Sequence, residues 1–501
     1  MHFEGSSTET QPFGAGKEST RGGRCTYAFC TVACTVLTGV LHAAQLTIDM
    51  LPDVALLRIF DFYVIQWRSA WYTLVHVCLN WRNVVFGSPH RLNLQLICGT
   101  KTPVRETLDV WPPLPIVVQN LGRFVPSVDN LVAALEYNDR ISEISLHHLS
   151  SSQFEQVLAA MQQPFPTLTG LQLWFNAGTA LVDPASFLGG SAPHLKSLSL
   201  RCNPLPGLPK LLLSATDLVT LRFSISHSVY ISPEALATCL SVLIRLETLM
   251  IGFESPQSHT DRPLPPPPTR IHLPVLRLLH FNGVSEYLEG LVARIDAPLL
   301  SNMRIVFFHQ LIFNTPHLTE LISRTPKFKT HDTVHVTFSL WAVLVRTFGK
   351  RLWFEVSCRR SDWQFSSLAQ VCGSAFPRAF ICAVEHLHLH TDFDDIPTPA
   401  AELPLLQALY GQDDVESNQW LEVFHPFTAV KYLYIPSEFT PRIAPVLQGL
   451  VGERVADVLP ALQTLFLEEP LPSGHVEEAI GQFVAARRLA GYPISISHYK
   501  Y

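Results

Sequence analysis

The sequence predicts an α/β protein in which a short N-terminal helical module is followed by a curved solenoid of parallel strands and helices. Two observations predict this fold class. Apolar residues at helical spacing crowd into residues 51–85, and a unit of the form apolar-x-x-apolar-x-apolar recurs from residue 141 onward. Its early copies begin at residues 141, 168, 195, 218, 246, 276 and 300, which gives steps of 23 to 30 residues. Such a period is typical of stacked repeats, because a single unit cannot bury its own apolar face.

Composition narrows the class of protein before any motif is considered. The 501 residues are 47% hydrophobic and only 16% charged, so the chain can form a large core. A net charge of −6 and the lack of any dense Lys/Arg cluster argue against a nucleic-acid-binding surface. The ten cysteines form no C-x-x-C pair, and no Asn-x-Ser/Thr sequon occurs. Both features favour a reducing compartment, the cytoplasm or the nucleus.

Residues 1–45 predict a disordered or weakly hydrophobic leader. The run Cys25–Ile48 contains no Asp, Glu, Lys or Arg, so a targeting segment stays open as an alternative. Its polar residues dilute the hydrophobic character, and we therefore expect no membrane insertion.

The helical module spans residues 46–90. A helix is predicted to start at Pro52, which suits a first position without a backbone N–H, with Asp53 near the positive end of the helix dipole. Its apolar stripe consists of Leu56, Ile59, Phe60 and Tyr63. A second helical stretch repeats the pattern with Leu74, Val77, Trp81 and Val84. Helices this short are marginal alone, and apolar faces left over on a small module predict a protein partner.

At these residues the chain resembles an F-box. The resemblance lies in the spacing of Leu51-Pro52, Leu56, Ile59-Phe60, Val77-Cys78 and Trp81-Arg82, with Asp53 where that family usually has Glu. It implies docking onto the Skp-type adaptor of a cullin–RING ubiquitin ligase. The residues that would make or support this contact are Leu51, Pro52, Leu56, Ile59, Phe60, Val77, Cys78 and Trp81. An ordinary helical hairpin inside a larger core is the alternative.

Residues 91–137 predict a linker region with short strands and a helix, and residues 138–501 a repeat domain. The repeating unit resembles a leucine-rich repeat, as in Leu195, Leu198 and Leu200. The two resemblances together identify the chain as similar to fungal-type proteins with an F-box and C-terminal leucine-rich repeats. The pattern is poor over 307–380 and 390–428, so a generic α/β domain stays open. The Pro-rich stretch 254–269 predicts an insertion between repeats.

We expect no enzyme activity, no cofactor and no metal. The chain has no phosphate-binding loop, nucleophile elbow or H-E-x-x-H motif. Strand alternation places His386, His388 and His390 on one face, where three imidazoles could hold zinc. Neighbouring side chains on one face of a strand lie about 7 Å apart, which favours simple outward-facing residues instead.

The residues that alternate with the inward leucines predict a surface for a protein substrate. Trp, Tyr and Arg are enriched at interface hot spots. The candidates are Trp174, Arg201, Arg222, Arg304, His386, His388, Tyr432, Tyr434 and Phe466. The resulting hypothesis is a substrate-recognition subunit of a Skp–cullin–F-box ubiquitin ligase, which brings a target protein to the ubiquitin-transfer machinery. The alternative is a leucine-rich-repeat interaction scaffold unconnected to ubiquitin.

Overall fold

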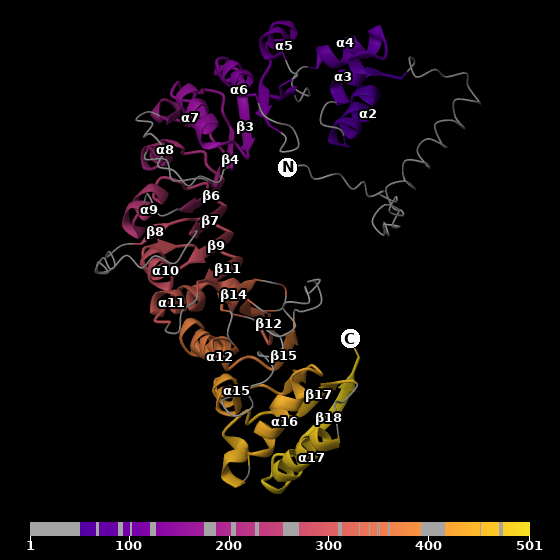
Figure 1. The fold of residues 1–501 in the computed structure, drawn as a ribbon, viewed down its shortest axis with the longest axis vertical. Coiled ribbons are helices and arrows are strands. Elements are labelled where there is room, and N and C mark those ends of the chain that lie inside the picture. The colour runs from indigo at the N-terminus through magenta and orange to yellow at the C-terminus, as the bar shows by residue number, and fades with distance from the viewer. Residues whose placement is uncertain are drawn as a thin grey trace, which may run out of the picture. The chain divides into compact units, whose positions relative to one another are not determined.

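The computed structural model divides between Asn93 and Leu94 into two compact units (Figure 1). It describes residues 51–66, 70–88, 94–100, 103–120, 127–174, 187–201, 207–225, 230–253, 270–308, 313–329, 331–339, 341–347, 349, 351–358, 361–391, 416–450, 452–469 and 474–500. The predicted leader 1–45, the run Cys25–Ile48 and the predicted Pro-rich insertion 254–269 lie outside the described residues.

The described part of the first unit is helical, and its helices pack against one another pairwise. They are α2 (Asp53–Gln66), α3 (Ala70–Val75) and α4 (Leu79–Gly87). Cys78 caps α4, because its Sγ accepts a hydrogen bond from the backbone N–H of Trp81 at 3.5 Å. Over the described ranges of both units, no helix combines the length and the hydropathy that crossing a membrane would require.

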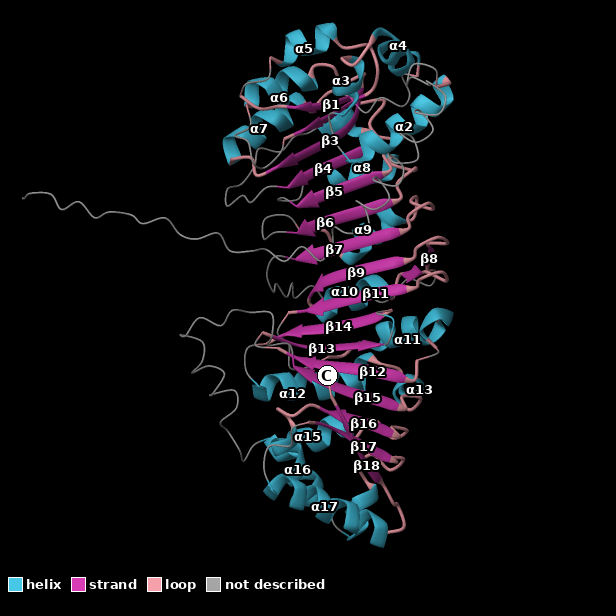
Figure 2. Cartoon of the chain, turned by 90° about the vertical axis from the view of Figure 1, so that its right-hand side faces the viewer, coloured by secondary structure: helices cyan, strands magenta, loops and turns pink. Residues whose placement is uncertain are grey.

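The second unit is built on one long sheet. Its strands are β1 (Leu94–Ile97), β2 (Ile116–Gln119), β3 (Ile141–His147), β4 (Gly170–Trp174), β5 (Ser197–Arg201), β6 (Thr220–Ile225), β7 (Thr248–Phe253), β9 (Leu278–Gly283), β11 (Asn302–Phe307), β12 (Thr333–Phe338), β13 (Ala342–Thr347), β14 (Leu352–Ser357), β15 (His386–Thr391), β16 (Tyr432–Ile435), β17 (Thr464–Glu468) and β18 (Ser495–Tyr499). A separate short pair consists of β8 (Ile271–His272) and β10 (Ile295–Asp296). Figure 2 shows the strands of the long sheet stacked one beside the next.

The helices of the second unit lie on one side of this sheet (Figure 1). They are α5 (Val104–Val110), α6 (Val128–Leu135), α7 (Ser151–Ala160), α8 (Leu208–Ser214), α9 (Pro233–Leu240), α10 (Ser285–Val292), α11 (Pro316–Arg324), α12 (Ser361–Gln370), α13 (Arg378–Ile381), α15 (Glu416–Phe424), α16 (Thr440–Gln448) and α17 (Gly474–Leu489). The inward positions of the predicted repeats, such as Leu195, Leu198 and Leu200, are buried. The predicted fold class is therefore confirmed for this unit: parallel strands alternate with helices around an apolar core.

The sheet begins earlier in the chain than the repeat pattern predicts. β1 pairs in parallel with β2, and β2 pairs in parallel with β3, so the stretch expected as a linker at 91–137 continues the same sheet. The side chains of Leu94, Leu96, Ile116 and Val118 are buried. Their alternation is too short to reveal a repeat period, which is why the sequence pattern separates this region from the units after residue 138.

One local change of topology explains the poor repeat pattern after residue 307. Strand β13 runs antiparallel to both β12 and β14, and β14 rather than β12 lies beside β11. The order along the sheet is thus β11-β14-β13-β12-β15. Ser339 closes the first hairpin with a backbone bond to Ala342 at 2.9 Å, and Gly349, with φ of +77°, lies in the second turn. The inserted strands add width to the sheet without a helix between them.

The last repeats are held together by a buried arginine. Arg487 of α17 is fully buried, and it donates to the backbone carbonyls of Val455, Leu459, Pro460 and Leu462 at 3.1 to 3.4 Å. Five donors in a rigid fork can satisfy several carbonyls at once, which an aliphatic side chain cannot do.

We expect Arg487→Met to lower the free energy of unfolding by about 2–4 kcal/mol, because it leaves several buried carbonyls without a donor. Urea unfolding followed by circular dichroism measures this difference. Arg488→Met is the matched control, since Arg488 is exposed on the same helix. Equal stability of the two variants would contradict the structural role of Arg487.

Candidate protein-binding surfaces

The first unit closes a small core of its own. Leu56 and Phe60 of α2 are buried, and the ring of Phe60 packs against the indole of Trp81 with centroids 4.8 Å apart. The backbone is fixed further by Arg82, whose Nε donates to the carbonyl of Val75 at 2.9 Å. Three of the residues predicted to contact an adaptor, namely Leu56, Phe60 and Trp81, therefore hold the helices together.

Other apolar side chains of the same unit remain on the surface. Among the predicted adaptor-binding residues, Ile59 is 38% and Val77 is 54% exposed, and Pro52 is also exposed, while Leu51 and Cys78 are half-buried. The structure adds three exposed apolar residues that the sequence motif did not single out: Val54, Leu79 and Phe86. Exposed apolar residues in such number on a small unit are typical of a protein-binding surface.

A second surface is the side of the long sheet opposite the buried leucines, here called the open face. Because the strands pair in register, the outward residues of successive strands line up in one row. This central row consists of Ser145, Gln172, Ser199, Arg222, Met250, His280, Arg304, Trp353, Arg346, His335, His388, Tyr434, Phe466 and Ser497. Its first three members are uncharged polar residues, its middle carries the cations Arg222, Arg304 and Arg346, and the rings of His388, Tyr434 and Phe466 follow before Ser497.

The aromatic end of the row forms a continuous stack of rings. The ring centroids of His388 and Tyr434 lie 3.8 Å apart, and those of Tyr434 and Phe466 lie 4.4 Å apart, with 7° between the planes in both pairs. Beside them, His386 stacks on Tyr432 at 4.5 Å. Flat rings held in this way lose little rotamer freedom when a partner binds, so they suit an interface.

The imidazoles in this part of the open face are held in the neutral form. Burial, and to a lesser extent the nearby imidazoles of His335 and His390, together lower the pKa of His388 to about 3. Burial likewise lowers the pKa of His335 to about 4, with smaller effects from His390 and Arg346. The pKa of His390 is lowered by burial and by Arg346, while the carboxylate of Glu468 opposes that shift. Near neutral pH these rings therefore present polar but uncharged edges.

A cationic section adjoins the rings. The guanidinium of Arg304 lies 4.5 Å above the centroid of the Trp353 ring, and its Nη2 is 3.5 Å from a carboxylate oxygen of Glu355. The indole Nε1 of Trp353 donates to the same carboxylate at 3.2 Å. These contacts fix Trp353 and Arg304, two of the residue types that contribute most to interfaces.

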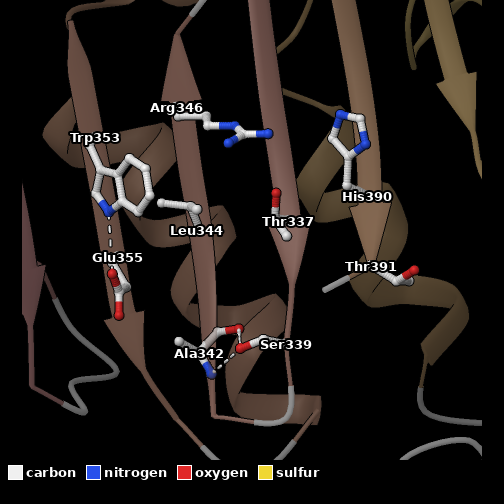
Figure 3. Close-up of a pocket in the computed structure, with 9 residues that line it drawn as sticks. All are labelled: Thr337, Ser339, Ala342, Leu344, Arg346, Trp353, Glu355, His390 and Thr391. Atoms are coloured by element: carbon white, nitrogen blue, oxygen red, sulfur yellow. Dashed lines mark hydrogen bonds between the residues drawn. The ribbon is translucent and has the colours of Figure 1, made fainter. Parts of the chain in front are cut away.

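A shallow pocket of about 310 Å³ opens beside this section. Its lining includes Thr337, Arg346, Trp353, Glu355 and His390, and Figure 3 shows Arg346 directed toward the strand that carries Thr337. Within the described ranges, Arg346 takes part in no hydrogen bond or ion pair, whereas Glu355 is engaged by Trp353 and Arg304. The pocket thus offers one free positive charge to a partner.

The structure places the predicted substrate-binding residues on the open face but in three separate rows. Arg222, Arg304, His388, Tyr434 and Phe466 belong to the central row. His386 and Tyr432 pair with each other in a second row, two residues before the central row on their strands. Trp174 and Arg201 pair with each other in a third row, two residues after the central row on their strands. The indole of Trp174 also donates to Ser199 Oγ at 3.3 Å.

Sequence reasoning missed three residues at the middle of this surface: His335, Arg346 and Trp353. They are outward residues of β12, β13 and β14, where the repeat period is interrupted. The available signal was strand alternation, because Val334, Val336 and Phe338 enclose His335 and Thr337. That signal gives the facing of a side chain, but it does not give the order of strands in the sheet.

Strand order, register and buried leucines define the second unit as a leucine-rich-repeat solenoid. Among solved structures, the chain is similar to the leucine-rich-repeat-containing protein LegL7 from Legionella pneumophila, with 13% sequence identity over 82% of this chain and 91% of that chain and a TM-score of 0.20. No family model matches the chain, and no curated protein does.

We expect the free energy of unfolding to fall as the pH is lowered from about 6.5 toward 4. His335 and His388 have lower pKa values in the folded chain than the ordinary 6.5, so the unfolded chain takes up protons first in this window. The stability contributed by the two neutral rings is fully present above pH 6.5. Replacing His388 with Phe keeps a ring in the stack and should flatten the dependence of the urea midpoint on pH. The expectation is wrong if the urea midpoint of His388→Phe depends on pH as that of the wild type does. It is also wrong if the control Tyr434→Phe flattens this dependence to the same extent.

Proposed function

We propose that this protein is the substrate-recognition subunit of a Skp–cullin–F-box ubiquitin ligase. In this proposal the first unit is an F-box that docks on the Skp-type adaptor, and the solenoid holds the target protein. The observation that carries the proposal is the exposure of Ile59 and Val77 on a unit whose own core is already filled by Leu56 and Phe60. Their positions also match the spacing of the F-box motif.

The mechanism is proximity. A chain that binds both the ligase and the target turns the encounter between target and ubiquitin donor into an intramolecular event, which raises their effective concentration. The chain itself would make and break no bond, so we propose that it is not an enzyme. Ligase complexes of this kind act in the cytoplasm or the nucleus, which agrees with the absence of a disulfide framework in the sequence.

The target would bind on the open face. Its central row offers rigid rings at Tyr434 and Phe466, a fixed cation at Arg304 and a free cation at Arg346. A partner that combines apolar or aromatic side chains with acidic ones fits this sequence of groups. The concave side of repeat proteins commonly binds extended segments in this manner.

We expect Ile59→Asp combined with Val77→Asp to abolish co-purification with the Skp adaptor, because two charges would be buried at the contact. Both residues are exposed, so the double variant should fold as the wild type does. Leu489→Asp is the matched control, since Leu489 is 90% exposed on α17 of the solenoid. Adaptor pull-down followed by immunoblotting measures the effect.

The same pull-down separates the proposal from a scaffold unconnected to ubiquitin. If wild-type protein of normal stability does not bind the adaptor, the ligase assignment fails while the solenoid can still bind a partner. If the double variant binds as well as the wild type does, Ile59 and Val77 are not the contact.

We expect the double variant Tyr434→Ala, Phe466→Ala to bind its target proteins weakly, so that the ubiquitylation of those proteins decreases. Loss of two hot-spot rings should weaken target binding by at least about tenfold. Quantitative mass spectrometry of ubiquitylated peptides, in cells that express each variant, measures this. Ser497→Ala in the same row is the control. The target role of the aromatic end would be rejected if the ring variant and this control behaved alike while adaptor binding persisted.

A further inference from the structure

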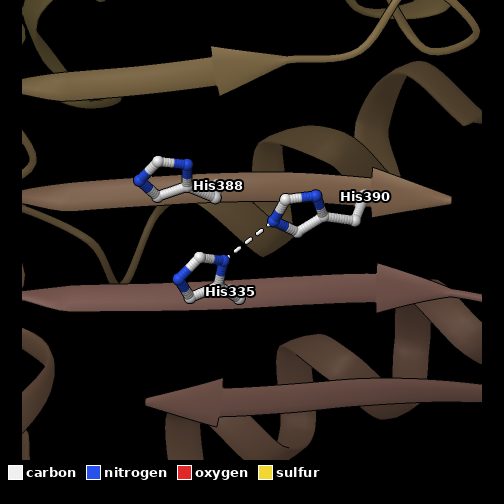
Figure 4. A group of neighbouring side chains, drawn as sticks. All are labelled: His335, His388 and His390. Carbon is white, nitrogen blue, oxygen red and sulfur yellow. Dashed lines mark hydrogen bonds between the residues drawn. The ribbon is translucent and has the colours of Figure 1, made fainter. Parts of the chain in front are cut away.

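Three histidines from two neighbouring strands meet at the centre of the open face. His388 and His390 occupy alternate positions of β15, and His335 of β12 pairs in register with His388. One ring nitrogen from each of the three lies within 4.8 Å of the other two. The closest pair is His335 Nδ1 and His390 Nε2, which are 2.8 Å apart (Figure 4).

We propose that His335, His388 and His390 form a binding site for one divalent transition-metal ion, with Zn²⁺ the best-matched ion. Imidazole nitrogen is a preferred ligand of Zn²⁺, and three protein ligands leave the fourth tetrahedral position open. The three rings are half-buried on the open face, so water or a side chain of a bound protein can reach that position. The site does not depend on the proposed ubiquitin-ligase function.

The geometry needs only local adjustment to hold an ion. Two nitrogens bound to zinc at about 2.0–2.1 Å with a tetrahedral angle are about 3.3 Å apart. The pair at 2.8 Å therefore separates by about half an ångström, and the third nitrogen closes by at most about 1.5 Å, which side-chain rotations can supply. The hydrogen bond between His335 and His390 would be exchanged for two metal–nitrogen bonds.

The proposed set differs from the three-histidine alternation visible in the sequence. His386 stacks on Tyr432 with ring centroids 4.5 Å apart, and it does not belong to the group whose ring nitrogens lie within 4.8 Å of one another. The third imidazole comes instead from β12, because the β13–β14 hairpin leaves β12 beside β15. Two histidines on one strand are too widely spaced to form a site by themselves, but a histidine on the adjacent strand lies between them.

One neighbouring charge disfavours the binding of a cation at this site, and another favours it. Arg346 pairs in register with His335, and its charge acts on both His335 and His390. The carboxylate of Glu468 acts on His390 with the opposite sign. Arg346 therefore lowers the affinity for a cation, and removing its charge should raise that affinity.

Isothermal titration of the full chain with Zn²⁺, and with Co²⁺ for its visible absorption, tests the site. We expect His335→Ala, His388→Ala and His390→Ala each to weaken the binding of one ion by at least about tenfold. His386→Ala is the matched control, because it removes an imidazole from the same strand and face, and it should leave the affinity unchanged. Arg346→Gln should tighten binding.

Circular dichroism without metal shows whether each variant is folded, and a variant that unfolds is replaced by the corresponding change to Phe, which keeps a ring but has no ligand atom. The proposal is overturned if the wild type binds no ion at micromolar concentration. It is equally overturned if the three variants bind as the wild type does, which would place the ion elsewhere on the chain, or if His386→Ala weakens binding as much as His388→Ala does.

Discussion

The structure depends on one constraint, which is that the strands of the long sheet from β1 to β17 must bury their inward apolar residues against neighbouring units. A unit such as Leu218, Leu221 and Phe223 has no core of its own and is stable only between its neighbours. Parallel pairing in register is the consequence, because a shift by one residue would turn the leucines toward solvent. The same pairing aligns the outward residues, so the row from Ser145 to Ser497 follows from the core rather than from any interaction along the row itself.

This constraint also explains how much the sequence could predict. The period of the leucines located the strands β3 to β7, β9 and β11, and strand alternation put Arg304, His388 and Tyr434 on the open face. The period failed over β12 to β14, since no helix separates these strands and one of them is reversed. The neighbours of His335 and Trp353 are therefore set by the order of the strands in the sheet, and no local sequence pattern predicts that order.

The first unit was predictable in a different way. Its spacing of apolar residues predicted short helices, but spacing alone could not separate core from surface. Phe60 and Ile59 are adjacent in sequence, yet one packs on Trp81 and the other is exposed. Residues outside the motif, such as Val54 and Leu79, are among the most exposed apolar side chains there. The motif thus predicts the helices of the unit more accurately than it predicts which of its side chains are exposed.

The central claim is that the first unit binds an adaptor while the open face stays free for a target. Hydrogen–deuterium exchange of the full chain, with and without purified Skp adaptor, tests it most directly. We expect slower exchange in α2 and α4 on binding and no change in β15, β16 and β17. Unchanged exchange throughout residues 51–88, or protection confined to the strands, would contradict the claim.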